Sequence, residues 1–207
     1  MISVVIPSLP GYSKLNNSLV DELHATTEQN LDIQVISSEA HFAKNVNDGL
    51  KKYTGDIVLV LNNDVIPFEG WAEWLESQAT NGLVSMTPRG DCGWGFGMSR
   101  EIQERIGLYD ENLINSYDDY DYFLRASLAG YNRILAPMPY MIHEGGHTIN
   151  SVWGTFEENS PVRVDACNRN KEYMLNKWPK IPINSVPSSH WALNGSRLIQ
   201  EYLGVKK

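Results

Sequence analysis

The most informative segment of the chain reads Gly55-Asp56-Ile57-Val58-Leu59-Val60-Leu61-Asn62-Asn63-Asp64. Its apolar run, residues 57–61, has no polar alternation, which is typical of a strand buried on both faces. Residues 2–6 and 33–36 are similar runs, and apolar positions spaced for one helical face lie between the runs, in residues 15–27 and 40–53. Strands that alternate with helices predict an α/β domain with a mostly parallel sheet.

The second half of the chain continues with shorter elements. A glycine-rich stretch at residues 90–97 predicts a loop beside a site, and residues 144–160 and 179–189 are expected as irregular segments. The remaining expected elements are a helix after Pro67 that carries Trp71, a strand at 83–87, a helix from its cap Ser99 to 106, a helix at 118–129, strands at 132–136 and 140–143, a helix from its cap Asp165 to 178, and a helix at 190–203.

Length, charge and cysteine content exclude several classes of protein. The 207 residues suit one domain, and 17 basic against 25 acidic residues give a net charge of −8. Such a charge disfavours a nucleic-acid partner, because phosphate backbones attract basic proteins. Cys92 and Cys167 lack metal or redox spacing, and no signal peptide or apolar run of about 18 residues is present. We therefore expect a cytoplasmic protein without a transmembrane segment.

The first candidate site is Asn62-Asn63-Asp64, which directly follows the strongest predicted strand. Ligands of open parallel sheets bind at the carboxyl ends of the strands. A carboxylate there can hold Mg²⁺ or Mn²⁺, which neutralises a diphosphate. The alternative is an ordinary Asn/Asp turn.

The second candidate is the acidic group Asp118, Asp119 and Asp121. Three carboxylates in four positions repel one another unless something compensates the charge. A helix N-terminus favours each by about 0.3–1 kcal/mol, which is one explanation. A general base for a substrate hydroxyl is the other.

The third candidate, His143-Glu144-Gly145-Gly146-His147, matches the H-E-x-x-H zinc pattern. That pattern needs a helix, and each of the two glycines costs a helix about 1 kcal/mol. A loop with one histidine that binds a metal or donates a hydrogen bond fits better. A zinc hydrolase with Glu157, Glu158 or Glu172 as the third ligand stays as the less favoured alternative.

Two further groups carry weaker signals. Lys44 and Asn47 share a helical face, so they either reach over the sheet edge to a phosphate or base or are simply solvated. Trp94, beside Gly95, and Trp153 lie in glycine-containing segments, where an aromatic ring can stack on an acceptor sugar.

Taken in their order along the chain, these segments resemble family-two glycosyltransferases of the GT-A fold, particularly rhamnosyltransferase-like and galactofuranosyltransferase-like members. The resemblance covers about residues 2–178. The matching segments are 3–7, 45–49, 55–64, 97–100, 104–111, 118–122 with Arg125 and 129–131, and 143–148.

The resemblance implies roles for individual residues. Asp64 and His143 would ligate Mn²⁺ or Mg²⁺, Asp119 would be the general base, and Asp118 and Asp121 would position the acceptor or support the base. The implied donor or nucleotide contacts are Pro7, Ser8, Ser38, Lys44, Asn47, Asn62 and Asn63. Asn62 replaces an acidic residue of many family members, and residues 37–39 replace acidic residues near the nucleobase, so the donor base stays open.

The implied architecture is a single-domain GT-A (Rossmann-like) α/β fold, a mostly parallel sheet flanked by helices, over residues 1–207. Residues 1–90 would bind the nucleotide sugar, 91–180 would carry the acceptor and catalytic half, and 181–207 would form a C-terminal extension with a helix. The implied activity is inverting, metal-dependent transfer of a hexosyl or deoxyhexosyl group from a nucleotide-diphosphate donor to an acceptor hydroxyl, most simply on a glycan. A non-catalytic nucleotide-sugar or glycan-binding module is the alternative. Either function requires Asp64, Asp119 and His143 to converge on one site.

Overall fold

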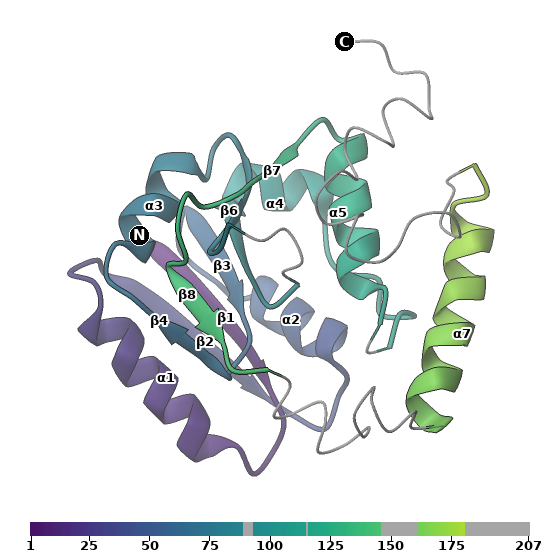
Figure 1. The fold of residues 1–207 in the computed structure, drawn as a ribbon, viewed down its shortest axis with the longest axis horizontal. Helices are drawn as coiled ribbons and strands as arrows, with labels where there is room; N and C mark the ends of the chain where they lie inside the picture. The colour runs from purple at the N-terminus through teal and green to yellow at the C-terminus, as the bar shows by residue number, and fades with distance from the viewer. Residues whose placement is uncertain (89–92, 115, 146–160, 181–207) are drawn as a thin grey trace.

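A computed structural model of the chain describes residues 1–88, 93–114, 116–145 and 161–180 (Figure 1). A six-stranded sheet in the order β2-β1-β3-β6-β5-β7 forms the centre, and β4 and β8 form a separate two-stranded sheet. The strands are β1 (Ile2–Ser8), β2 (Leu31–Ser37), β3 (Ile57–Leu61), β4 (Val65–Pro67), β5 (Gly82–Ser85), β6 (Gly95–Ser99), β7 (Asn132–Ile134) and β8 (Met141–His143). The helices are α1 (Ser13–Ala25), α2 (Phe42–Leu50), α3 (Trp71–Gln78), α4 (Arg100–Ile106), α5 (Asp118–Leu128) and α7 (Pro161–Lys177).

Strand direction determines which chain segments meet at the edge of the sheet. β1 pairs in parallel with β2 and β3, and β5 pairs in parallel with β7. β6 is antiparallel to both of its neighbours, and its first residue, Gly95, lies opposite Leu61, the last residue of β3. The segment before β6 therefore lies beside the carboxyl end of β3.

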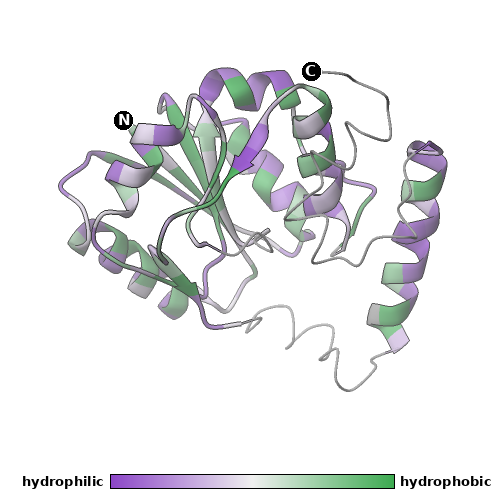
Figure 2. Ribbon diagram, turned by 45° about the horizontal axis from the view of Figure 1, so that its top comes forward, coloured by the Kyte–Doolittle hydropathy of each residue, from purple (hydrophilic) through white to green (hydrophobic). Residues whose placement is uncertain are grey.

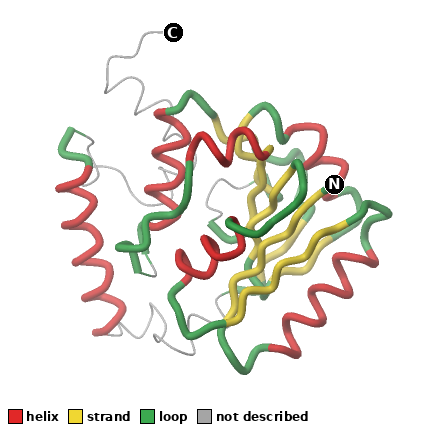
Figure 3. Tube along the Cα trace, turned by 180° about the vertical axis from the view of Figure 1, so that it is seen from behind, coloured by secondary structure: helices red, strands yellow, loops and turns green. Residues whose placement is uncertain are grey.

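Helices cover both faces of the sheet (Figure 3). Val5, Val58 and Val60 pack with α2, α4 and α5 on one face. Val4 and Leu59 point to the opposite face and pack with α1 and α3. This alternation explains the unbroken apolar runs, and Figure 2 shows the apolar strands between helices of mixed hydropathy. Each large buried side chain contributes about 1.5–3 kcal/mol.

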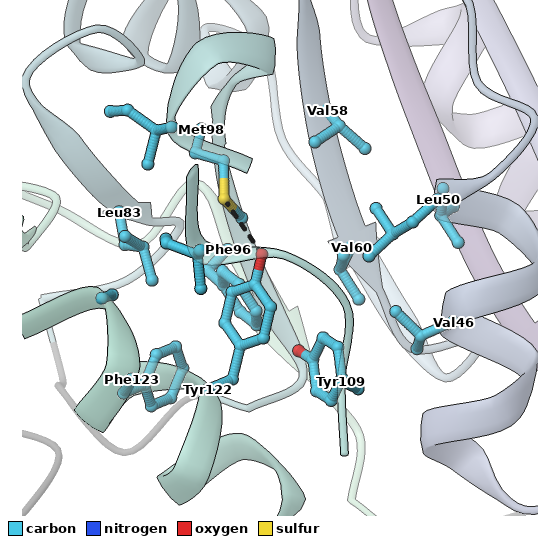
Figure 4. Packing of buried hydrophobic residues seen from close by; sticks show 14 of the residues in the cluster. Val46, Leu50, Val58, Val60, Leu83, Phe96, Met98, Tyr109, Tyr122 and Phe123 are labelled. Carbon is cyan, nitrogen blue, oxygen red and sulfur yellow. Dashed lines mark hydrogen bonds between the residues drawn. The ribbon is translucent and has the colours of Figure 1, made fainter. Parts of the chain in front are cut away.

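Aromatic residues of α5 pack against one face of the sheet (Figure 4). Tyr122 is fully buried, stacks on Tyr109 at 4.4 Å between ring centroids, and donates from its hydroxyl to Met98 Sδ at 3.5 Å. Phe123 packs edge-on against Phe96 at 4.9 Å. These contacts fix α5 against β6.

The early strands, the first helices, the Ser99 cap and the α5 helix confirm the expectations from sequence. Residues 95–99, expected at the end of a glycine-rich loop and the start of a helix, instead form β6. Gly97 is required there because a Cβ would lie 2.6 Å from Leu75 Cδ1. Asp165 is not a cap: α7 begins at Pro161, a favoured residue for a first helical position.

The short strand β4 was not expected from sequence. The predicted helix at 190–203, and the predicted irregular segment beyond residue 145, lie outside the described residues. Among the helices of the described residues, none combines the length and the apolar character that crossing a membrane requires.

Candidate functional site

A buried polar network holds the carboxyl ends of β1 and β3 together. Asn63 Nδ2 donates to Asn16 Oδ1 at 3.0 Å and to Ser8 Oγ at 3.2 Å, and Ser8 Oγ donates to Asn16 Oδ1 at 3.0 Å. All three side chains are buried. Sequence reasoning missed Asn16, although a polar residue among the apolar positions of a helix face was a signal. Ser8 and Asn63, expected as donor contacts, use these atoms to build the edge of the sheet.

Asp64 and His143 lie in direct contact. His143 Nε2 is 2.8 Å from Asp64 Oδ1, and the Asp64 side chain is only 3 % exposed. The contact follows from the pairing of β4 with β8, where Val65 lies opposite His143 and Glu144 N donates to Asp64 O at 2.9 Å. His143 ends a strand, so the helix that a zinc-protease motif needs is not formed there. His147 lies outside the described residues.

Asn62 completes this group. Asn62 Nδ2 lies 3.4 Å from His143 Nε2. Asn62 Oδ1 is buried and has no hydrogen-bond partner within the part of the chain that the structure describes. An orphaned buried oxygen beside a carboxylate and an imidazole is unfavourable unless a ligand satisfies it.

These three side chains fit a divalent cation. Ligand bonds to such ions are about 2.0–2.6 Å long, so two donors 2.8 Å apart can bind one ion. Among the described residues, no three His, Cys, Asp or Glu side chains are arranged so that together they could hold a metal ion. Asp64, His143 and Asn62 would therefore leave coordination positions for oxygens of a bound molecule.

Trp94 connects this group to the sheet. Its indole stacks on His143 at 5.1 Å between centroids and 14° between planes, and its carbonyl accepts from Asn62 N at 2.8 Å. Its neighbour Gly95 is buried, and a Cβ there would contact Leu61 Cδ1 at 3.4 Å. Gly95 is the first residue of β6 and pairs with Leu61 of β3, and the acceptor contact expected for it stays a prediction. Trp153 lies outside the described residues.

Gly93 connects the same segment to the acidic group on α5. A Cβ at Gly93 would lie 2.9 Å from Asp119 Cβ and would also overlap the Asp119 carboxylate. The Asp119 side chain thus lies directly against Gly93, one residue before the tryptophan that stacks on His143. The segment Gly93–Trp94 therefore lies between the Asp64–His143 pair and Asp119.

The acidic group begins with a strained turn. Tyr117 has φ of 63°, and it is the only non-glycine residue with positive φ among the described residues. This conformation costs about 1–2 kcal/mol. Asp118 Oδ1 accepts from Asp119 N at 3.0 Å, and Asp119 Oδ1 accepts from Tyr120 N at 2.8 Å.

The protonation of this group is set mainly by burial. Burial raises the pKa of Asp118 to about 7, and the neighbouring charge of Asp119 adds to the effect. Burial also raises the pKa of Asp119, although the Tyr120 amide and the charge of Arg133 oppose it. A carboxylate whose pKa is raised towards neutrality is suited to accept a proton.

The Asp121 carboxylate is held by contacts within the fold. It is fully buried, and its two oxygens accept from Arg125 Nε at 2.8 Å, Trp178 Nε1 at 2.9 Å and Lys177 Nζ at 2.8 Å. Lys177 also contacts Asp110 at 2.6 Å. Burial alone would raise the pKa of Asp110, but Lys177 and hydrogen bonds from neighbouring groups hold it well below its usual value. These partners occupy both oxygens of Asp121, and its expected role, to position the acceptor or to support the base, stays a prediction.

The predicted donor residues of α2 are separated. Asn47 is buried, donates to Tyr109 O at 3.0 Å and Glu111 Oε1 at 2.8 Å, and accepts from Tyr109 N at 2.8 Å. Lys44 pairs with both oxygens of Asp48 at 2.6 Å on a partly exposed face. The two side chains therefore do not converge in the structure, and the donor role expected for each stays a prediction.

Asn45 connects the carboxyl ends of β1 and β2. It was not predicted as a site residue from the sequence. Its Nδ2 donates to Ser8 O at 3.0 Å, and its Oδ1 accepts from Ser38 Oγ. Pro7, opposite Ile36 in the β1–β2 pair, is the last residue before this junction. The structure thus brings Pro7, Ser8 and Ser38 together at one edge of the sheet.

The sequence matches no protein-family model and no curated protein. Among solved structures, a mannosyltransferase from Pyrobaculum calidifontis in complex with GDP-Man and Mn²⁺ matches with a TM-score of 0.57 at 12% identity, covering 100% of this chain and 76% of the other. A mutant Drosophila β1,4-galactosyltransferase 7 in complex with manganese, UDP-Gal and xylobiose matches with a TM-score of 0.54 at 13% identity, covering 79% and 80%. The architecture of this chain is therefore the GT-A glycosyltransferase fold.

Proposed function

We propose that this protein is an inverting glycosyltransferase that moves a sugar from a nucleotide-diphosphate donor to an acceptor hydroxyl with the help of Mn²⁺ or Mg²⁺. The observation that carries the proposal is the placement of Asp64 and His143 on one side of Gly93–Trp94 and of Asp119 on the other, at the carboxyl edge of a GT-A sheet. The two glycosyltransferase structures named above both hold manganese and a nucleotide sugar, which supports this proposal.

The residues that would hold the ion are Asp64, His143 and, through its buried Oδ1, Asn62. Bound there, a divalent ion supplies positive charge that stabilises the diphosphate as it leaves. The nucleoside would lie over the ends of β1 and β2, where Pro7, Ser8 and Ser38 meet. Backbone groups and Ser38 carry these contacts in our proposal, because the side chains of Ser8 and Asn63 bind one another.

Asp119 is the proposed general base. Its carboxylate takes the proton of the acceptor hydroxyl as that oxygen forms a bond to the anomeric carbon. The bond from the anomeric carbon to the diphosphate breaks, and its electron pair leaves with the diphosphate. Attack opposite to the leaving group inverts the anomeric centre in one displacement. Asp118 lies buried beside Asp119, and burial together with the charge of Asp119 raises the pKa of Asp118.

A second candidate function, a non-catalytic nucleotide-sugar or glycan-binding module, has one observation in its favour. The proposed ion site contains a single carboxylate, Asp64, among the described residues. Such a module would bind the donor with Mn²⁺ but would release no nucleoside diphosphate when an acceptor is added.

A thermal-shift panel of nucleotide sugars, with Mn²⁺ or with a chelator, tests the proposal. A ligand at 100 times its Kd stabilises the native state by about 2.7 kcal/mol, which is about 5–11 °C in Tm for a protein of this size. The same panel on Asp64→Ala should lose the Mn²⁺-dependent shift. Asp56→Ala is the matched control. Asp56 directly precedes β3, at the opposite end of this strand from Asp64, and its side chain is 89% exposed.

The donor found in the panel is then offered with candidate hydroxyl acceptors, and release of nucleoside diphosphate is measured. Turnover with inversion at the anomeric carbon supports the transferase. Binding without turnover favours the binding module, and no Mn²⁺-dependent binding of any nucleotide sugar refutes both the transferase and a nucleotide-sugar-binding module.

A further inference from the structure

The face of α7 that meets the rest of the protein is unusually polar. Four residues with the spacing of one helical face donate hydrogen bonds to groups in residues 110–121: Asn170, Tyr173 and Lys177 of α7, and Trp178 directly after it. The docking face of a helix is ordinarily an apolar stripe. Here two buried apolar residues, Ala166 and Met174, accompany a row of directional contacts.

Asn170 makes the contacts nearest to the acidic group. It is fully buried, and its Nδ2 lies 2.9 Å from the carbonyl oxygens of Ile114 and Ser116 and 2.8 Å from Ser116 Oγ. Ser116 directly precedes Tyr117, the residue in the left-handed conformation, and the first turn of α5 follows. Asn170 therefore fixes the backbone at the point where the strained turn begins.

Lys177 and Trp178 contact the first turn of α5 at Asp121, on the far side of Asp118 and Asp119 from Ser116. Both donate to Asp121 Oδ1, at 2.8 Å and 2.9 Å, and Lys177 also reaches Asp110 at 2.6 Å. The segment that contains Asp118 and Asp119 is thus held by α7 on both of its sides.

We propose that α7 is a positioning helix for the acidic segment, and that Asn170 is a positioning residue that keeps Asp119 directed at Gly93. The proposal rests on the proposed function, since it concerns the base of that reaction. A left-handed tyrosine persists only where its surroundings over-determine the backbone. The contacts of Asn170 supply that constraint, so its loss allows Tyr117 to relax and turns the carboxylate of Asp119 away from its place.

The test compares Asn170→Ala with Asn168→Ala, the same substitution at an exposed position of the same helix. We expect Asn170→Ala to lower kcat about tenfold or more while the Kd of the donor with Mn²⁺ stays within twofold of wild type. Asn168→Ala should leave both quantities unchanged. An unchanged kcat in Asn170→Ala overturns the proposal, and so does a loss of kcat that only follows the loss of folded protein, measured by thermal unfolding.

A second substitution separates positioning from general destabilisation. Glycine adopts the left-handed conformation without steric cost, so Tyr117→Gly added to Asn170→Ala should recover part of the lost kcat. A double variant that is no better than Asn170→Ala contradicts the role assigned to the turn.

Hydrogen exchange provides a readout that does not depend on activity. In Asn170→Ala the amides of Asp119 and Tyr120 should exchange faster, while those of β1 and β3 stay as in wild type. If wild type and Asn168→Ala transfer no sugar, the proposed function fails, and this exchange pattern alone decides the inference. Unchanged exchange at Asp119 and Tyr120 overturns it.

Discussion

The substitution Asn47→Ala distinguishes two roles for one residue. Helical spacing suggested that Asn47 reaches over the sheet edge to the donor. In the structure its side chain is 1 % exposed and binds the backbone of Tyr109 on both sides, donating to the carbonyl at 3.0 Å and accepting from the amide at 2.8 Å. The structural reading predicts a loss of stability, and the donor reading predicts a loss of affinity.

The size of the stability loss follows from the groups left behind. Alanine removes both partners of the Tyr109 backbone, and each buried backbone group without a partner costs about 1–3 kcal/mol. The hydrogen bond to Glu111 adds little to this loss, because the Glu111 carboxylate is partly exposed and can bind water instead. Two such groups give about 2–6 kcal/mol, against a usual total stability of about 5–15 kcal/mol. A loss of about 4 kcal/mol lowers Tm by about 8–16 °C.

Urea unfolding gives the free energy of unfolding, and titration with the donor identified by the thermal-shift panel gives its Kd. Asn17→Ala, an exposed asparagine on α1, is the matched control, and it should change stability by less than about 0.5 kcal/mol. We expect Asn47→Ala to be much less stable with an unchanged donor Kd below its transition. A stability loss under about 1 kcal/mol together with a weaker Kd would refute the structural reading and return Asn47 to the donor site.

Three further outcomes are expected. Asp119→Asn should lower kcat by about 10²–10⁴-fold with donor affinity retained, because a general base contributes about that much, and unaltered turnover would remove Asp119 from this role. Asp64→Ala should weaken Mn²⁺-dependent donor binding at least tenfold where Asp56→Ala does not, as isothermal titration would measure; equal affinities would contradict the ion site. Burial raises the pKa of Asp118 in the folded protein to about 7, whereas the unfolded chain releases this proton near pH 4. The free energy of unfolding therefore falls as pH rises from about 4 to about 7. Asp118→Asn lacks this titration, so its urea stability should fall less over that window and exceed wild type most above pH 7; parallel pH curves would speak against it.

The sequence predicted those parts of the fold that depend on local periodicity. Residues 57–61 are β3 in the structure because five consecutive apolar side chains need burial on both faces, and no other element satisfies that as simply. The cap at Ser99 was likewise readable, since its side chain accepts from Ile102 N, as capping residues do. The pairing of Asp64 with His143, 79 residues apart, came from the order of motifs and not from any local pattern.

Buried amides and carboxylates are the residues whose surroundings the sequence could not predict. Asn16, Asn45 and Asn47 lie on helices where exposed and buried asparagines look alike in sequence, and their roles depend on partners contributed by other segments. Asp121 looked like a member of an acidic catalytic group, yet its partners Lys177 and Trp178 come from a helix more than fifty residues later. A polar side chain shows its role only when its partners are known.

The reversed strand β6 explains why the candidate site forms where it does. Parallel neighbours need a crossover that carries the chain to the opposite edge of the sheet, whereas antiparallel neighbours can be joined at one edge. Because β6 is antiparallel to both β5 and β3, it begins at the edge of the sheet where β3 ends, and Gly93 and Trp94 lie there between His143 and Asp119. One of the glycines that made residues 90–97 look like a loop, Gly97, is what lets β6 pack, because a side chain there would strike Leu75. The glycine content that hid β6 in the sequence therefore also allows this strand to form, and with it the placement of Gly93 and Trp94 between His143 and Asp119.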